Sequence, residues 1–478
     1  MSRPLVIIGA PAAPSKKKLA DEQAPLVTRN TAPGVPVAVG MRFHPPTSLL
    51  SQAAPRLLGI LVLLLTPHLA LAWGEPHLAI TKGALAVLPN WQKQTLGAEL
   101  EPLGSNYCLI PDHVYTDKAN AKFATMDRYP GEVYVKKLHL PVAQQEENLD
   151  TLHYFMDKGV TALQAGQVGD AARYMGTLCH VIEDFGSPSH TVPGDNMFTL
   201  LQQFLPPTEV MKGKLMHGPI ENGTFAVSIP GYQPQLLGLT VPEASWRLLH
   251  RVHEGILNAR TTTVPIIQAL YADDAQAVTK HQLRAATVDA QIVADAIHTI
   301  LCLGTDTFTA PAQDTLGTVN IAPFWPIEAP NLYYPQSHFF SSPYWGHARS
   351  GLTLEGGTTE TPLKLRLQGK DGPQETTIAQ GISTGMGKPL TWHLPKGVYQ
   401  RFTVLAGLQA GLGDQGRVEF TVLGDGKPLA TAIVNGTDPA HPFDCDIQGI
   451  TQLQLATTAR GLNAKSNYAV WAEPMLRK

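Results

Sequence analysis

The sequence predicts a multidomain protein in which an all-α domain is followed by an all-β sandwich, and three observations support this. The chain has 478 residues, enough for two or three domains. Apolar residues recur three and four positions apart in the first half, as in amphipathic helices. After about Gly351 the chain changes to short alternating runs separated by Gly, Asp and Pro, as in antiparallel strands. We expect an N-terminal segment at 1–72, a helical domain at 73–310, a linker at 311–350 and a β-sandwich at 351–478.

Three long helices are expected in the helical domain, at 148–166, 170–185 and 276–303, the last ending at Gly304 as a helix should. Residues 315–350 are rich in Pro, aromatic residues and Asn without a period, which indicates a linker. The expected strands share alternating polarity and a spacing near ten residues: 362–367, 399–407, 417–423, 429–434, 452–456 and 468–471.

Composition excludes several classes of protein. The 36 Lys and Arg residues against 39 Asp and Glu residues give a formal charge of -3, so the chain lacks the basic excess of duplex nucleic-acid binders. Hydrophobic residues make up 44% of the chain, which excludes disorder as its main state. The four cysteines lie far apart without a CxxC pair, so we expect no thiolate zinc site. They predict one disulfide at most, with four buried thiols as the alternative.

The N-terminal segment is typical of an export signal. Residues 57–65, LLGILVLLL, form an apolar run after Arg56, and residues 70–72, ALA, have the small-x-small pattern that signal peptidase accepts. The run is about half of the roughly twenty residues that a membrane span needs. We therefore expect cleavage before Trp73, a secreted or periplasmic mature protein and no transmembrane anchor after processing.

Imidazoles and carboxylates occur at metal-ligand spacing in the helical domain. His180 and Asp184 lie four positions apart, so on a helix they project from one face and can hold one metal ion. Pro188 then ends the helix and lets His190 turn back toward the same pocket. Such ligands without a thiolate suit hydrolytic zinc, whose open positions hold an activated water.

A second pair has the same spacing. His217 and Glu221 also lie four positions apart. Gly218 and Pro219 between them imply that a helix begins at or after His217. An ordinary turn is the alternative reading of this pair.

Together with Trp73-Gly74 at the expected mature N-terminus and His77 after it, this array resembles the bacterial zinc-dependent phospholipase C family and the related fungal single-strand-specific zinc nucleases, over about residues 73–304. The resemblance implies a helical fold, three zinc ions and phosphodiester hydrolysis. In that family the free α-amino group and carbonyl of the first residue, a Trp, bind zinc. An amide nitrogen inside a peptide bond cannot ligate as an amine can, so cleavage before Trp73 would complete the site.

The resemblance also implies the ligand sets, in which Asp184 bridges two ions. The three sets are Trp73, His77 and Asp184; His180 and Asp184; and His190, His217 and Glu221.

The second zinc of the family also takes an Asp and a His from upstream. Asp112 matches the Asp best, and it would be both a ligand and a base for the attacking water. His139 is our choice for the His, although the two residues lie farther apart than is usual in the family. His153 is the alternative for this role. It would lie on the helix 148–166, which directly precedes the helix that carries His180, and it would be too near in sequence to turn back to the same metal ion. The remaining alternatives are His113, Asp117 and Asp127.

The expected function is hydrolysis of a phospholipid phosphodiester by a metal-activated water. Glu221 stands where the phospholipases have Glu and the nucleases Asp, and no strip of basic and aromatic residues suits a single strand. A single-strand nuclease is the alternative. Aromatic residues that could line the pocket rim and accept a headgroup or a base are Phe198, Phe204, Tyr129 and Tyr134.

Residues from about Gly381 resemble the NPCBM family, a jelly-roll-like carbohydrate-binding β-sandwich often joined to secreted hydrolases. The resemblance implies a glycan ligand, and a glycan-binding protein with an inactive helical domain is a third hypothesis. Val470 stands where the family usually has an acidic residue, and we expect Trp392 and Trp471 to pack the core. The motifs that carry the resemblance are GIS at 381–383, LTW at 390–392, YQRF at 399–402, GRVEFTV at 416–422, DG at 425–426 and WAEP at 471–474.

Overall fold

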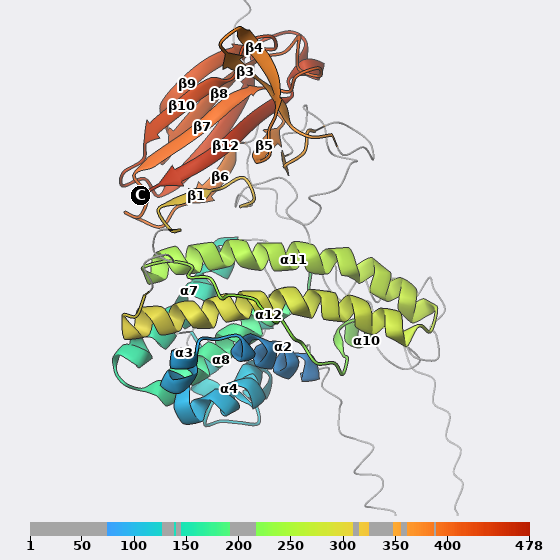
Figure 1. The fold of residues 1–478 in the computed structure, drawn as a ribbon, viewed down its shortest axis with the longest axis vertical. Helices are drawn as coiled ribbons and strands as arrows, with labels where there is room; N and C mark the ends of the chain where they lie inside the picture. Colours follow the sequence, from blue (N-terminus) through green and yellow to red (C-terminus); the bar gives the residue numbers. More distant parts are fainter. Residues whose placement is uncertain are drawn as a thin grey trace, which may run out of the picture. The chain divides into compact units, whose positions relative to one another are not determined.

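The computed structural model describes residues 74–126, 138–139, 145–191, 217–308, 315–324, 348–354, 361–386 and 389–478. Helices occupy the described chain up to Thr305 and strands dominate after it (Figure 1), which confirms the expected fold class. The expected signal peptide lies outside the described residues, as do Trp73, Asp127, Tyr129, Tyr134, Phe198 and Phe204.

The helical part contains short helices near its start and four long ones that carry most of its core. The three long helices expected from periodicity are present within a few residues of their expected bounds. The α-helices are α2 (Gly74–Ala86), α3 (Asn90–Leu96), α4 (Leu100–Ser105), α5 (Ile110–His113), α7 (Gln145–Gln164), α8 (Val168–Phe185), α10 (His217–Glu221), α11 (Val241–Tyr271) and α12 (Ala275–Thr305), and 3-10 turns lie at Gly97–Glu99, Tyr107–Leu109 and Ala121–Ala124.

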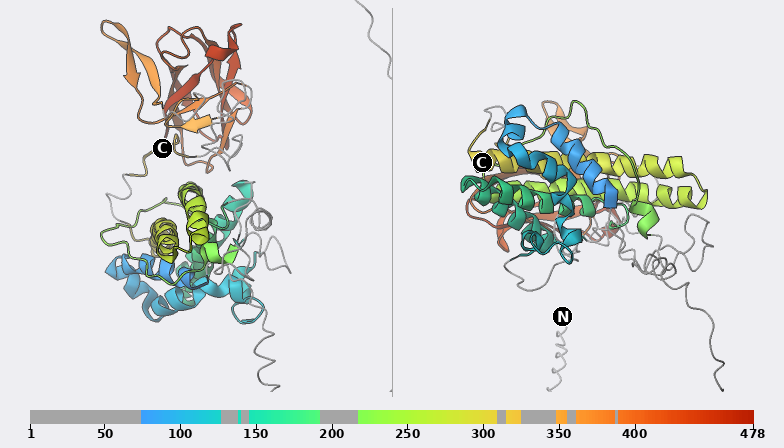
Figure 2. Two further views of the ribbon diagram at one scale, coloured as in Figure 1. Left: turned by 90° about the vertical axis from the view of Figure 1, so that its right-hand side faces the viewer. Right: turned by 90° about the horizontal axis from the view of Figure 1, so that it is seen from below.

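The helices α11 and α12 lie side by side, and the left view of Figure 2 shows them end-on. Asp274 caps α12 by accepting a hydrogen bond from the backbone of Ala277. The helix ends at Thr305, before Asp306 in the left-handed conformation, rather than at Gly304. In the described part of the chain, α12 alone is long and apolar enough to cross a membrane, yet most of its apolar stretch is buried, as in the core helix of a folded domain.

Helix α8 lies at the centre of the helical part. Every side chain in its last three turns, from Met175 to Phe185, is buried. Leu178, Val181 and Ile182 belong to one apolar cluster shared with α2, α7, α11 and α12. Polar groups on this helix are therefore held in fixed positions by close packing on all sides.

In the described β part, two antiparallel sheets form a sandwich, and β3 and β4 form a separate two-stranded sheet. One sheet has the strand order β10-β7-β12-β5-β2 with β1 also on β12, and the other has the order β6-β11-β8-β9. The rings of Phe420 on β8 and Trp471 on β12 meet edge to face with centroids 5.0 Å apart, which joins the inner faces of the two sheets. The strands are β1 (Thr318–Asn320), β2 (Ala348–Ser350), β3 (Lys364–Gly369), β4 (Gly372–Thr377), β5 (Gly381–Thr384), β6 (Leu390–His393), β7 (Arg401–Leu408), β8 (Arg417–Gly424), β9 (Lys427–Asn435), β10 (His441–Asp446), β11 (Gln452–Ala459) and β12 (Ala469–Arg477), with a 3-10 turn at Ala464–Ser466.

The linker expected at 311–350 contains strands of the sandwich. Strand β1 pairs with the last strand, from Thr318 beside Arg477 to Asn320 beside Met475, and β2 pairs with β5. Residues 318–320 and 348–350 of this segment are thus parts of a sheet, because strands farther along the chain complete their backbone hydrogen bonds.

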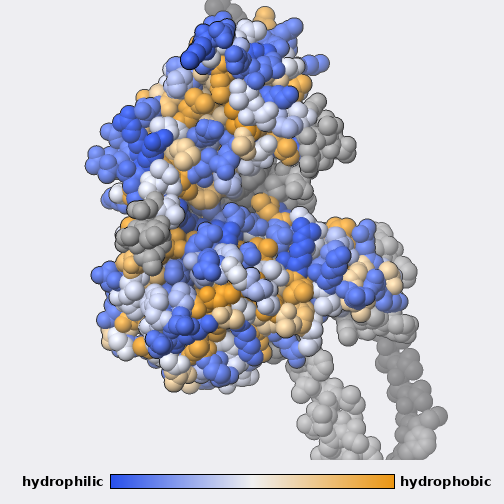
Figure 3. Space-filling view, in the orientation of Figure 1, coloured by the Kyte–Doolittle hydropathy of each residue, from blue (hydrophilic) through white to orange (hydrophobic). Residues whose placement is uncertain are grey.

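The burial of side chains tests the expectations for the tryptophans of the sandwich and for the four cysteines. Trp392 and Trp471 are both fully buried, so they pack the core as expected. All four cysteines are buried free thiols, which matches the alternative to a disulfide. On the face shown in Figure 3, hydrophobic residues are interspersed with hydrophilic ones, as is usual for a folded protein surface.

Candidate metal centre

Helix α8 supplies the middle of the candidate site. His180 and Asp184 are fully buried on this helix, one turn apart. His180 Nε2 lies 3.1 Å from Asp184 Oδ2. The predicted spacing therefore does bring an imidazole nitrogen and a carboxylate oxygen to one point.

A neighbouring backbone carbonyl orients the His180 ring. His180 Nδ1 lies 2.7 Å from the carbonyl oxygen of Cys108. Because a carbonyl only accepts hydrogen bonds, Nδ1 carries a proton, and Nε2 is the nitrogen that faces Asp184. This contact depends on Gly176, one turn earlier, where an added Cβ would lie 2.5 Å from the backbone of Tyr107. Glycine thus lets the 3-10 turn Tyr107–Leu109 pack directly against α8.

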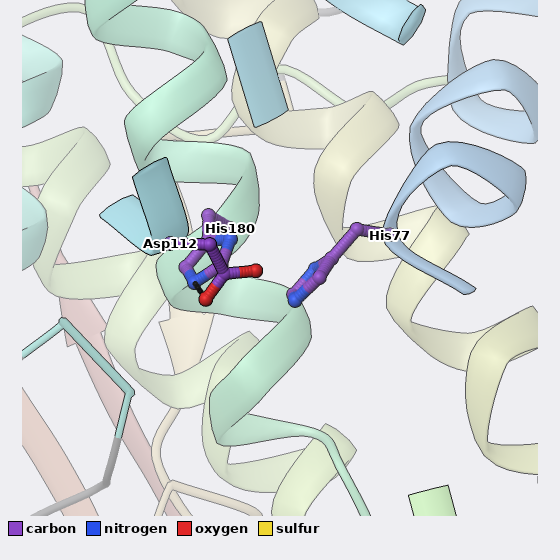
Figure 4. Close-up of side chains that lie close together, drawn as sticks. All are labelled: His77, Asp112 and His180. Atoms are coloured by element: carbon purple, nitrogen blue, oxygen red, sulfur yellow. Dashed lines mark ion pairs between the residues drawn. The ribbon is translucent and has the colours of Figure 1, made fainter. Parts of the chain in front are cut away.

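Helix α2 brings His77 to the same place, pointing toward Asp112 of α5 and His180 of α8 (Figure 4). The His77 and His180 rings stack with centroids 4.1 Å apart. His77 Nε2 lies 3.3 Å from Asp184 Oδ1, and neither atom has a hydrogen-bond partner among the described residues although both are buried. Two buried polar atoms that face each other in this way lack the partner that such groups normally have.

The upstream residues Asp112 and His139 join the same cluster. His139 Nδ1 lies 2.6 Å from Asp184 Oδ2 and 2.9 Å from His180 Nε2. Asp112 Oδ1 lies 3.8 Å from His180 Nε2 and 4.0 Å from His139 Nδ1. The wide sequence separation of Asp112 and His139 therefore does not keep them apart in space.

The alternatives to this upstream pair lie elsewhere. His153 Nδ1 pairs with the hydroxyl of Ser245, at 3.0 Å, on helix α11. Asp117 accepts hydrogen bonds from the backbone and side chain of Asn120 in a turn. His113 belongs to none of the candidate metal groups found among the described residues.

A second cluster contains His190, His217 and Glu221. His217 Nε2 and His190 Nε2 lie 3.0 and 3.4 Å from Glu221 Oε2. His217 begins the short helix α10, as the glycine and proline after it suggested. His190 Nδ1 lies 3.8 Å from Asp184 Oδ1, so this cluster adjoins the first.

Polar contacts fix the loop that carries His190. Ser189 donates a hydrogen bond of 2.5 Å to Glu221 Oε2. From helix α11, Thr263 donates to the carbonyl of Pro188 and Arg260 donates to that of Thr191, on either side of His190. Helix α8 has already ended at Phe185, and these bonds hold the following turn so that His190 faces back toward Asp184.

The spacing of these atoms would allow them to hold metal ions. Zinc ligands at about 2.1 Å and tetrahedral angles lie about 3.4 Å from one another. Three groups of three residues bring ligand atoms within 4.8 Å of one another: His77, Asp112 and His180; His139, His180 and Asp184; and His190, His217 and Glu221. Buried ligand atoms with no hydrogen-bond partner in the described part of the chain are His77 Nε2, Asp112 Oδ2, Asp184 Oδ1, His190 Nδ1 and Glu221 Oε1.

The electrostatics reflect this concentration of carboxylates and imidazoles. Burial alone would raise the pKa of Asp184, yet the imidazoles of His180, His190 and His77 hold it well below its usual range. Burial opposes protonation of His77, but Asp184 and Glu183 raise its pKa well above the ordinary value. The cluster thus favours positive charge beside Asp184, which protons or metal cations can supply.

Sequence reasoning missed two buried carboxyl groups beside the site. Glu183 lies next to Asp184 and pairs with His77, while Asp289 on α12 packs against the backbone of Gly186. Burial, reinforced by Glu183, raises the pKa of Asp289 well above its usual range. The available signal was an acidic residue inside an otherwise apolar helical segment, which rarely occurs without a partner or a function.

The C-terminal part of the chain matches a known domain family. Residues 338–477 match the model of the NPCBM/NEW2 domain. Solved structures similar to the chain include CBM51-2 with INT domains from Clostridium perfringens ZmpB, in complex with GlcNAc, at 21% identity over 28% of each chain, with a TM-score of 0.24. CBM51 from Clostridium perfringens GH95, in complex with methyl-galactose, is 16% identical over 33% of this chain and 99% of its own, with a TM-score of 0.27.

A longer match is the alpha-toxin of Clostridium perfringens from an avian strain. It is 11% identical and covers 83% of this chain and 85% of its own, with a TM-score of 0.28. TM-scores this low do not establish a shared overall fold. None of the curated proteins compared with the chain matches it. The resemblance seen in the sequence is therefore confirmed most directly in the C-terminal part, where residues 338–477 match the NPCBM/NEW2 domain.

Proposed function

We propose that the chain is a secreted or periplasmic zinc-dependent phosphodiester hydrolase of phospholipase C type, with three zinc ions and a glycan-binding C-terminal module. The observation that carries this proposal is the convergence of imidazole nitrogens on Asp184. Nitrogen atoms of His77, His139, His180 and His190 lie between 2.6 and 3.8 Å from its two oxygens. A fully buried carboxylate that four imidazoles surround suits a bridge between cations.

The proposed metal ligands fall into two adjoining groups. His77, Asp112, His139, His180 and Asp184 would hold two of the zinc ions. His190, His217 and Glu221 would hold the third. Bound zinc supplies Lewis acidity toward phosphoryl oxygens and lowers the pKa of water from about 16 toward 7. Trp73 at a processed N-terminus would complete the ligand set with its amine.

Asp112 is the proposed general base. Its side chain retains slight solvent exposure, 5%, whereas that of Asp184 has none. Asp112 Oδ2 is itself buried and has no hydrogen-bond partner among the described residues, so it could accept the proton of a water held inside the site. Buried Asp184 and Glu221 would serve only to hold cations.

The test is hydrolysis by the secreted protein, with phosphatidylcholine vesicles and single-stranded DNA as competing substrates. We expect zinc-dependent release of the lipid headgroup, abolished by Asp184→Asn and unchanged by the matched control His153→Gln, since His153 lies outside the clusters. Faster hydrolysis of DNA would support the nuclease alternative. No hydrolysis of either substrate in zinc-supplied protein would leave the proposal without support.

The glycan-binding role rests on the NPCBM match. Trp392 and Trp471 are fully buried, so a sugar would have to bind other residues. We expect the full-length secreted protein to bind at least one sugar of a glycan array. Sugar binding without phosphodiester hydrolysis would favour the hypothesis of an inactive helical domain.

A further inference from the structure

Glu183 is a buried carboxylate that the proposed ligand sets leave unused. It lies on α8 directly before Asp184 and is fully buried. Its Oε2 lies 2.6 Å from His77 Nδ1, and its Oε1 accepts a hydrogen bond of 2.6 Å from the hydroxyl of Thr81. Both partners belong to α2, so Glu183 joins the central helix to the helix that carries His77.

We propose that Glu183 is a positioning residue that fixes His77 as the Nδ1–H tautomer and so directs Nε2 toward the metal. The identity of that metal rests on the proposed function. A carboxylate accepts hydrogen bonds, so the ring nitrogen facing Glu183 carries the proton. The other nitrogen, Nε2, lies 3.3 Å from Asp184 Oδ1, and in the neutral ring it has the lone pair that a metal can bind.

The neighbouring imidazole is oriented in the same sense by a different group. His180 Nδ1 faces the carbonyl of Cys108, and its Nε2 faces Asp184. The two stacked rings therefore present the same nitrogen to the same carboxylate. A charged acceptor holds an imidazole N–H more strongly than a neutral carbonyl and makes the opposite nitrogen more basic.

Packing of α8 against α2 does not by itself explain why a carboxylate is buried at position 183. A buried carboxylate costs free energy of desolvation, and an apolar side chain would pack α8 against α2 without that cost. Thr81 occupies the second oxygen, so the carboxylate plane is fixed from both sides. This arrangement specifies an orientation of His77, which packing alone would not require.

The experiment compares Glu183→Leu with Glu183→Gln, using protein labelled with ¹⁵N in histidine. In the metal-free wild type, brought to a pH at which the His77 ring is neutral, we expect the ¹⁵N shifts of His77 to report the Nδ1–H tautomer. The leucine variant should lose that preference and bind one zinc ion about 10- to 100-fold more weakly in chelator competition. The glutamine variant, whose amide oxygen can still accept from Nδ1, should restore the tautomer. His180 should keep its tautomer in both variants and serves as the internal control.

Thr81→Val provides a second variant in case the loss of Glu183 prevents folding. It leaves the carboxylate but removes the bond to Oε1, and we expect a roughly fivefold loss of affinity for the same zinc ion. Wild-type tautomer and affinity in the leucine variant would overturn the role of Glu183 while leaving phosphodiester hydrolysis intact. A wild type that neither binds zinc nor hydrolyses phosphodiesters would instead refute the proposed function, and the metal-free tautomer would still decide the role of Glu183.

Discussion

Replacing Gly176 with alanine should disturb both the core and the candidate metal centre. The added Cβ would lie 2.5 Å from the carbonyl carbon, the oxygen and the Cβ of Tyr107, whereas ordinary contact begins at 3.4 Å. The 3-10 turn Tyr107–Leu109 would have to move by about 1 Å, because backbone atoms cannot rotate away. Such a shift would stretch the bond between Cys108 and His180, now 2.7 Å, beyond hydrogen-bond range.

The expected cost follows from these terms. Overpacking a rigid contact costs about 1–3 kcal/mol, and an unpaired buried polar group costs about 1–3 kcal/mol more. The higher helix propensity of alanine than of glycine offsets about 1 kcal/mol of this loss of stability. We therefore expect Gly176→Ala to lower the free energy of unfolding by about 3 kcal/mol and to weaken zinc binding.

The assay is denaturant unfolding followed by far-UV circular dichroism, which reports the helices. Gly169→Ala on the same helix is the matched control, because its Cβ would meet only the ends of the flexible side chains of Arg173 and Glu99. We expect this control to be neutral or slightly stabilising. A Gly176→Ala protein as stable as the control, with unchanged zinc affinity, would refute the reasoning about close approach.

Three further predictions follow from the site and its surroundings. Asp184→Asn should remove at least two zinc ions together, measured by metal analysis of purified protein, and full zinc content would contradict a bridging role. Ser189→Ala removes a donor to buried Glu221 and should cost about 1.5–3 kcal/mol in denaturant unfolding, more than Ser187→Ala, which leaves that donor in place. Burial lowers the pKa of His253 to about 4. Between about pH 6.5 and pH 4, the unfolded chain therefore binds a proton at this histidine that the folded chain does not. The free energy of unfolding should be highest above about pH 6.5 and should fall as the pH falls toward 4. His253→Leu should reduce the slope of unfolding free energy against pH by about 1.4 kcal/mol per pH unit in this window, and an unchanged slope would show that His253 is not the group.

Local spacing predicted much of the candidate site. The pairs His180–Asp184 and His217–Glu221 each lie one helical turn apart, so the sequence determines their approach once the helix forms. The Cys108 carbonyl that orients His180 was not predictable, because a backbone acceptor leaves no mark on the sequence. Its position depends on the packing of a distant turn against Gly176.

Strands β1, β4 and β10 were not among the strands expected from the sequence, because their pattern of polar and apolar residues is weak. Strand β4 (Gly372–Thr377) is exposed along almost its whole length, so it lacks the alternation that marks a strand. Strand β1 has only three residues, too few to show a period, and it exists because the chain terminus pairs with it. In β10, Phe443 and Cys445 alternate with exposed residues, so a signal was present, although Pro442 weakens it.

The central claim is that a processed N-terminus and eight side chains assemble a cluster of zinc ions around Asp184. The most direct measurement is the anomalous diffraction of the secreted protein at the zinc absorption edge, with the N-terminal residue read from the same map. We predict three zinc peaks, two of them sharing Asp184 and one bound by the amine of Trp73. A map with no zinc peak near Asp184, or with the N-terminus on the outer surface, would contradict the claim.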